Sequence, residues 1–142
     1  CRFFKRDTSM SLENTLAPWR PQVLSVLRFM AGLEILQHGM AKILHFPPVP
    51  QMANVQIGSL MGIGGLIELI GGALMVIGLF TRPTAFILCG FTAVAYFMVH
   101  ASKSFFPILN GGELAVLYCF VFLYIFAAGP GPWSVDAMRG RK

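Results

Sequence analysis

The stretch Arg28-Phe-Met-Ala-Gly-Leu-Glu34-Ile-Leu-Gln-His38-Gly-Met-Ala-Lys42 decides how the rest of the chain is interpreted. It predicts a membrane-spanning helix with one polar face. At about 100° per residue, Arg28, His38 and Lys42 share one third of the circumference, and a carboxylate lies one turn before His38. A charged side chain at the centre of a bilayer costs from a few to more than about 10 kcal/mol. We therefore expect this polar stripe to face a bundle interior or a hydrated cavity.

The composition is that of an integral membrane protein. Of the 142 residues, 56% are hydrophobic and 12% are charged, whereas roughly a quarter of the residues of soluble domains are charged. One membrane domain of several spans uses the whole length and leaves no room for a separate soluble domain. The formal net charge of +5 is spread over both ends, which indicates membrane orientation and contact with lipid headgroups, and no nucleic-acid partner.

Proline and glycine breaks divide the chain into four expected spans, at about 21–44, 55–80, 84–101 and 112–128. Thr81-Arg82-Pro83 is expected to form a tight turn between the second and third spans. The predicted fold is all-α, a four-helix transmembrane bundle over residues 21–136. A basic N-terminal segment (1–20) precedes this domain, and a basic tail (137–142) follows it.

Basic residues outside the spans gather at the two termini and in the turn around Arg82, while the other side holds only Lys42 and Lys103. By the positive-inside rule, both termini are expected to face the cytoplasm. The expected location is the bacterial inner (plasma) membrane, with a multi-pass topology.

Glycines and cysteines constrain the packing. Four glycines of the second span fall on one side and predict a face that another helix approaches closely, namely Gly58, Gly62, Gly65 and Gly72. We place Cys89 about 8 Å from the cytoplasmic end of its span and Cys119 about 10 Å from the outer end of its own. About 10 Å of depth then separates them, so we expect neither a disulfide nor a thiol relay within this chain. Metal-motif spacing is also missing apart from the weak pair Glu34 and His38, so no metal is expected.

The polar groups of the four spans are expected to converge on the outer half of the bundle, in a pocket that opens outward. The candidate ligand-binding residues are Arg28, His38, Lys42, Glu68, Tyr96, His100, Asn110 and Glu113. Each also has a structural interpretation. The carboxylate can pair with Arg28 and fix two helices, the histidines can be hydrogen-bonded at an interface, the lysines can extend to headgroups, and the tyrosines can serve packing.

Glu68 carries the sharpest expectation. A carboxylate near mid-bilayer must be paired or neutral. We expect it to be buried, with Arg28, His38 or His100 within hydrogen-bonding or ion-pair distance.

Taken together, these residues resemble the DoxX family of small four-helix membrane proteins over about residues 21–136. The resemblance is carried by Leu27-Arg28, Gly32, His38-Gly39 and Lys42; Glu68 to Gly72; Gly78 to Pro83; Ala95 to His100; Phe106 to Glu113; and Gly129 to Asp136. Glu34 stands where such proteins usually carry an apolar residue.

The resemblance implies membrane-bound redox systems, since relatives include a subunit of thiosulfate:quinone oxidoreductase and a membrane partner of thiol and superoxide enzymes. The first hypothesis is a redox-associated subunit whose pocket binds a quinone, as a possible cofactor, or a small anion. The alternative is a non-catalytic accessory subunit that docks onto a larger membrane complex through the glycine face or the aromatic fourth helix. The sequence assigns no catalytic residue and leaves open whether the protein is an enzyme.

Overall fold

The structure, a computed structural model, describes residues 8–140 and is all-helical over that range. Its body consists of four long helices, α2 (Arg20–Ile43), α3 (Leu60–Ile77), α4 (Thr81–Ala95) and α6 (Glu113–Ala128). A π-helical turn, Tyr96–His100, extends α4. The shorter elements are α1 (Thr8–Leu16), α5 (Pro107–Asn110), α7 (Val135–Met138) and the 3₁₀ turns Ala17–Trp19 and Pro50–Met52.

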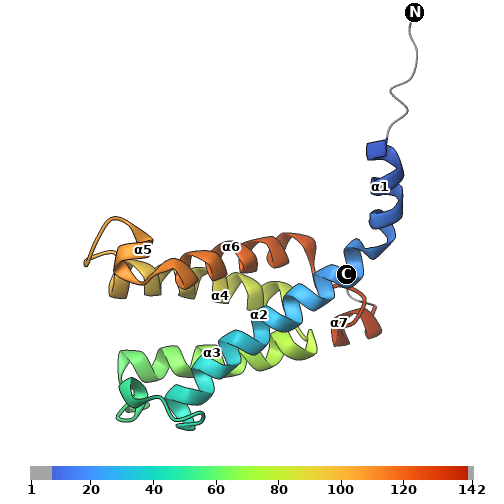
Figure 1. The fold of residues 1–142 in the computed structure, drawn as a ribbon. Coiled ribbons are helices and arrows are strands. Elements are labelled where there is room, and N and C mark those ends of the chain that lie inside the picture. Colours follow the sequence, from blue (N-terminus) through green and yellow to red (C-terminus); the bar gives the residue numbers. More distant parts are fainter. Residues whose placement is uncertain (1–7, 141–142) are drawn as a thin grey trace, which may run out of the picture.

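The long helices form two pairs. Helix α2 crosses α3, and α4 runs beside α6 (Figure 1). The start of α2 and the end of the chain lie at one end of the molecule, while α5 and the connection 44–59 lie at the other. Helix α1, which the sequence did not predict inside the basic N-terminal segment, projects away from the body.

The helix bounds differ from the expected ranges mainly around residues 55–59 and 78–83. Helix α3 begins at Leu60, where the Ser59 hydroxyl accepts a hydrogen bond from the third residue of the helix, and it ends before Gly78, which has a φ of 68°. The expected tight turn at Thr81-Arg82-Pro83 is wrong, because these residues form the first turn of α4. Proline fits there, since N–H groups of a first turn have no intrahelical acceptor.

The glycine face of α3 is used inside the chain. A Cβ atom at Gly72 would lie 2.6 Å from the Leu36 Cα, and one at Gly65 would lie 2.8 Å from the Lys42 Cβ, so α2 covers this face. Gly58 lies before α3 and has nothing within 4 Å. Because α2 already covers this glycine face, another protein cannot dock through it, contrary to one expectation from the sequence.

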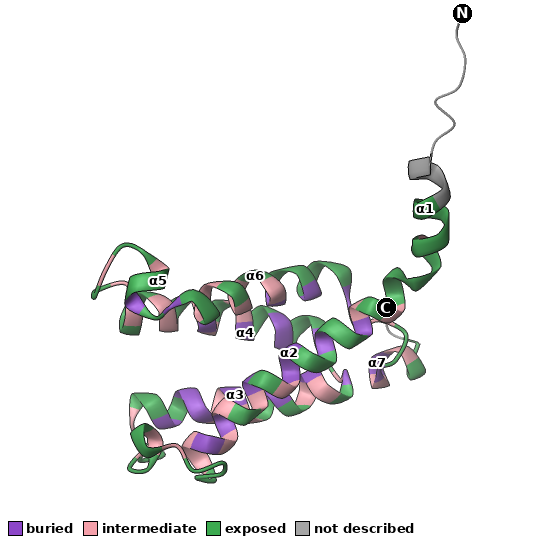
Figure 2. Ribbon diagram, viewed as in Figure 1, coloured by how far each residue is buried: buried purple, intermediate pink, exposed green. Residues whose placement is uncertain are grey.

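The core lies where the two helix pairs meet. Its centre is a set of fully buried side chains, Met75, Ala85, Leu88, Phe122 and Ile125. Figure 2 shows buried residues along the inward faces of α2, α3 and α4, whereas much of the outward surface is exposed. The exposed surface carries many large apolar side chains, among them Phe97, Ile70 and Leu117.

Two helical stretches are long and apolar enough to cross a membrane, Leu60–Ile77 and Thr81–His100. In an 18-residue window of each stretch, only 39% and 22% of the residues are buried within the protein. Helix α6 is apolar but has only 16 residues, and α2 carries Arg20, Arg28, Glu34 and Lys42. Apolar surface exposed on this scale requires an apolar environment or a partner.

Gly39 tests the close contact of α2 with α3. A methyl group there would overlap the backbone of Leu69, so Gly39→Ala should push the helices apart and lower the free energy of unfolding by about 1–3 kcal/mol. Gly90→Ala on α4 is the matched control, because a Cβ at Gly90 meets nothing within 4 Å. Thermal unfolding in detergent measures both, and an equal stability of the two variants would contradict the packing described here.

Candidate functional site

Arg28 lies at the end of the body where the C-terminal segment packs. Its guanidinium donates hydrogen bonds to backbone oxygens of other segments. Its Nε donates to the Pro130 oxygen at 2.9 Å and its Nη2 to the Trp133 oxygen at 2.5 Å. Its Nη1 donates to the Val76 oxygen at 2.9 Å and also to that of Met75. The side chain is 1% exposed. Arg28 was predicted as a pocket residue, but here it joins α2, the end of α3 and the C-terminal segment.

Asp136 and Arg82 complete the same end. The Asp136 carboxylate accepts the N–H groups of Phe80 at 3.0 Å and Thr81 at 2.8 Å, which anchors the start of α4. Arg82 donates to the backbone oxygens of Phe126 at 2.6 Å and Ala127 at 2.8 Å, near the end of α6. Helix ends leave such groups unpaired, and they need partners wherever water is absent. We call Arg28, Arg82 and Asp136, with their backbone partners, the terminal clamp.

Glu68 is buried as predicted, at 6% exposed, but its partner is Lys42. The Lys42 Nζ lies 2.6 Å from the Glu68 Oε2. The expected pairing with Arg28, His38 or His100 is wrong. Antiparallel register explains why, since the start of α2 meets the end of α3 and the end of α2 meets the middle of α3. Lys42 therefore lies beside Glu68, whereas Arg28 is several turns away, beside Val76.

Tyr96, His100 and Asn110 come together as predicted at the opposite end, but they bond to one another and to the connecting segment. The His100 Nδ1 lies 3.0 Å from the Asn110 backbone oxygen, and the Asn110 Nδ2 donates to the Tyr96 hydroxyl at 3.3 Å. The same amide donates to the Ser104 oxygen at 2.9 Å, and its Oδ1 accepts the Gly112 N–H at 2.7 Å. This network closes the connection from α4 to α6. Glu113, also predicted as a pocket residue, is exposed at the first position of α6.

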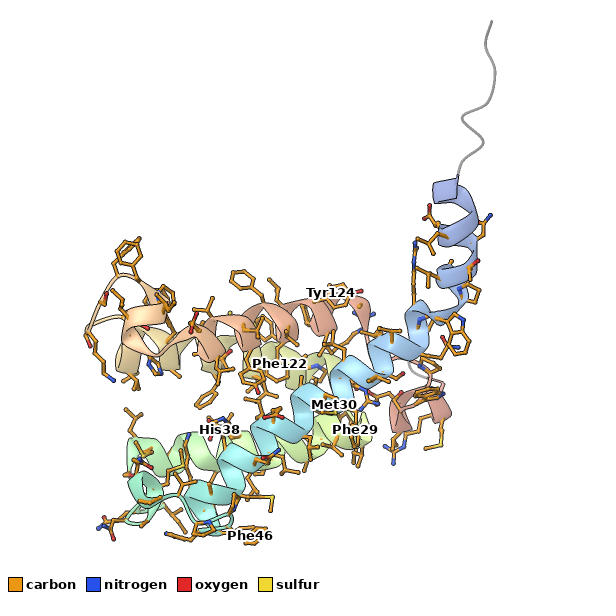
Figure 3. The ribbon with its side chains drawn as sticks, viewed as in Figure 1. Phe29, Met30, His38, Phe46, Phe122 and Tyr124 are labelled. Atoms are coloured by element: carbon orange, nitrogen blue, oxygen red, sulfur yellow. The ribbon has the colours of Figure 1, made fainter. Side chains whose placement is uncertain are left out.

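Two polar side chains of the predicted stripe remain, Glu34 and His38. His38 is half-buried and makes no hydrogen bond among the residues that the structure describes, and Figure 3 labels it on α2. Glu34 is exposed one turn before it. Helix α2 also contacts α6, which carries Tyr118. We call Glu34, His38 and Tyr118 the α2–α6 polar face.

Two hollows mark the surface. One, of about 290 Å³, is an apolar groove between α3 and α4 lined by Ile63, Leu66, Ile67, Ile70, Gly71, Leu74, Thr84, Ile87 and Leu88. The other, of about 150 Å³, is lined by Ala41, His45, Pro48, Val49, Pro50 and Ala53. None of the eight predicted site residues lines either hollow. The lining of the apolar groove is almost wholly aliphatic and offers almost nothing to a polar ligand.

The expected separation of the two cysteines is wrong. The Sγ atoms of Cys89 and Cys119 lie 3.7 Å apart, and both residues are half-buried free thiols. The error came from measuring the two depths from opposite ends. Counted from the end that Arg82 ties together, Cys89 lies eight residues after Thr81 and Cys119 nine residues before Ala128, or about 12 and 13.5 Å.

Within the part of the chain that the structure describes, no group of three or more His, Cys, Asp or Glu side chains is arranged to hold a metal ion.

Sequence reasoning missed Asp136 as an anchor of α4. Its signal was modest, a single acidic residue after a Gly-Pro-rich stretch.

Comparison with known proteins identifies the family. A family model described as DoxX matches residues 23–101. An uncharacterized protein of Haemophilus influenzae is 42% identical over 127 residues, which make up 87% of this chain and 95% of that protein. No solved structure matches the chain.

The Lys42–Glu68 pair predicts a stability change. Glu68→Gln should strand the buried ammonium and cost about 3–5 kcal/mol, and adding Lys42→Met should recover part of that loss. Glu13→Gln removes the exposed pair with Arg20 and should change little. Thermal melts of the single and double variants measure the coupling, and strictly additive effects would show that the pair does not matter.

Arg28→Lys tests the terminal clamp. A lysine keeps the charge but lacks the planar fork that reaches several oxygens at once. Hydrogen bonds from a charged group contribute about 1.5–3 kcal/mol each, so losing two or more should cost at least about 3 kcal/mol. Unfolding by heat, compared with Arg20→Lys on the exposed surface, checks the result. Equal melting temperatures for the two variants would refute the role given to Arg28.

Proposed function

The chain belongs to the DoxX family, and from this we propose that it is a membrane-embedded, redox-associated subunit that binds a quinone headgroup at the α2–α6 polar face. The observation that carries the proposal is His38, a half-buried imidazole inside a long helix with no hydrogen-bonding partner among the described residues. A polar group taken out of water without a partner is costly. A ligand that hydrogen-bonds to His38 offsets this free-energy cost.

The proposed topology has four spans, formed by α2, α3, α4 with its π turn, and α6. The start of α2 and the end of the chain lie at the same end of the body, and Arg20, Arg82 and Arg139 belong to segments at that end. The positive-inside rule then places both termini in the cytoplasm of a bacterial inner membrane. His38 lies in the second half of its helix, toward the outer leaflet.

Charge pairing favours a quinone over a small anion. Arg28 donates its hydrogen bonds to four backbone oxygens, and the charge of Lys42 is neutralised by Glu68. Neither of these two predicted cations is free to bind an anion, and the unpaired side chains of the polar face are an imidazole, a carboxylate and a phenol. An imidazole N–H bonds well to a neutral quinone carbonyl, while a carboxylate repels an anion.

The apolar groove between α3 and α4 does not extend the polar face, because the α3–α4 junction lies across the buried core from the α2–α6 junction. A quinone of the membrane carries a long isoprenoid chain, which extends from the polar face into lipid in this proposal. The headgroup contact at His38 therefore determines specificity.

His38→Ala should weaken quinone binding about tenfold, the equivalent of one lost hydrogen bond of about 1.4 kcal/mol. Purified protein titrated with a short-chain ubiquinone analogue measures the affinity. His45→Ala is the matched control, because His45 is exposed in the connection after α2. Equal affinity in the two variants, or no bound quinone after extraction of the native lipids, would sink the proposal.

The alternative function is an accessory subunit that docks onto a larger electron-transfer complex. Because α2 covers the glycine face, docking would use the outward face of α6, where Phe120, Tyr124 and Leu117 are exposed. This alternative makes the polar face part of an interface. Purification in mild detergent distinguishes the two functions, since a stoichiometric large complex without bound quinone would favour docking.

A further inference from the structure

Cys89 and Cys119 face each other across the pair α4 and α6. Their sulfur atoms lie 3.7 Å apart, which is van der Waals contact, and a disulfide bond is about 2.05 Å long. Closing the bond needs an approach of about 1.7 Å, which rotation of the two side chains and a slight shift of the helices supply.

Contacts at both ends of the pair α4 and α6 keep the two thiols at the same height along the helices. Near one end, Arg82 joins the start of α4 to the backbone of α6 through the oxygens of Phe126 and Ala127. At the other end, His100 contacts the Asn110 backbone just before α6 begins. With both ends tied, one sulfur is presented to the other at a high effective concentration.

The surroundings of the thiols select the kind of oxidant. Both thiols lie in the middle of apolar helices, and Cys89 packs against the buried core cluster that contains Leu88 and Phe122. Charged oxidants such as a peptide disulfide would have to leave water to reach them. A suitable oxidant is soluble in lipid and takes up both electrons and both protons, so that no charge remains in the apolar site.

We propose that Cys89 and Cys119 form a dithiol that reduces a membrane quinone and closes into a disulfide between α4 and α6. Both S–H bonds break and one S–S bond forms. The two electrons and two protons pass to the two carbonyl oxygens of the quinone, which leaves as a quinol. The quinone acceptor rests on the function proposed above, whereas the geometry of the thiols does not.

Tyr118 connects the two sites. It precedes Cys119 on α6, and Tyr118 and Cys89 pack against the same core cluster. Tyr118 is also the α6 member of the α2–α6 polar face. A headgroup that contacts Tyr118 therefore lies one residue from Cys119 along α6.

The test uses the whole 142-residue chain carrying Cys1→Ser, so that Cys89 and Cys119 are the only cysteines of that chain. The reduced protein is mixed anaerobically with a short-chain ubiquinone analogue. Quinol is followed by absorbance, and free thiols are followed by the gel shift after labelling with a maleimide polymer. We expect one quinol per disulfide, with loss of both labels, and no quinol above background from Cys89→Ser or Cys119→Ser.

A displaced thiol is the matched control. The variant Cys119→Ser with Phe120→Cys keeps two cysteines, but it turns one of them by about 100° toward the exposed face of α6. It should not close a disulfide. Equal closure in this variant would overturn the geometry.

Molecular iodine, a neutral oxidant that enters lipid and needs no binding site, separates the remaining outcomes. If it fails to close the pair, the dithiol proposal is overturned. If quinone binds but both thiols remain labelled, the dithiol proposal fails while the quinone site stands. If iodine closes the pair and quinone neither binds nor reacts, the proposed function and the quinone acceptor fail together.

Discussion

The guanidinium of Arg28 is the interaction on which this structure depends. It joins α2 to carbonyl oxygens at the end of α3 and to the Gly-Pro segment after α6, at Pro130 and Trp133. Helix ends leave such oxygens unpaired, and lipid offers them no donor. A planar group with five N–H donors meets this need from a single position. The position of α2 relative to α3 and to the C-terminal segment follows from it.

The terminal clamp gives a structural role to charged residues of the sequence motifs. Arg28, Arg82 and Asp136 all lie in stretches that carry the resemblance to the DoxX family, and a charged residue in such a stretch suggests a binding site. In the fold, each is bound to backbone atoms of another segment. The motif residues at this end therefore maintain the fold. Polar groups that make no hydrogen bond among the described residues are better candidates for a ligand site. His38 is the foremost of these, and it also lies in a matching stretch.

Two groups of polar or reactive side chains adjoin α6. Glu34 lies on α2 one turn from His38, and α2 contacts α6. Cys89 and Cys119 belong to no motif, yet they are in contact across α4 and α6. The polar face and the dithiol therefore lie at the junctions of α6 with α2 and with α4.

The sequence by itself determined the helical class, the approximate position of the four long helices and the burial of Glu68. Hydrophobic content, proline breaks and the high cost of an exposed charge in lipid are all local properties, so a single chain reveals them. Only the tertiary structure decided which polar groups meet. Lys42 rather than Arg28 reaches Glu68, and Cys89 reaches Cys119, because antiparallel register fixes which levels face each other. Register depends on close contacts such as Gly72 against Leu36 and on the terminal clamp, which join residues far apart in the chain.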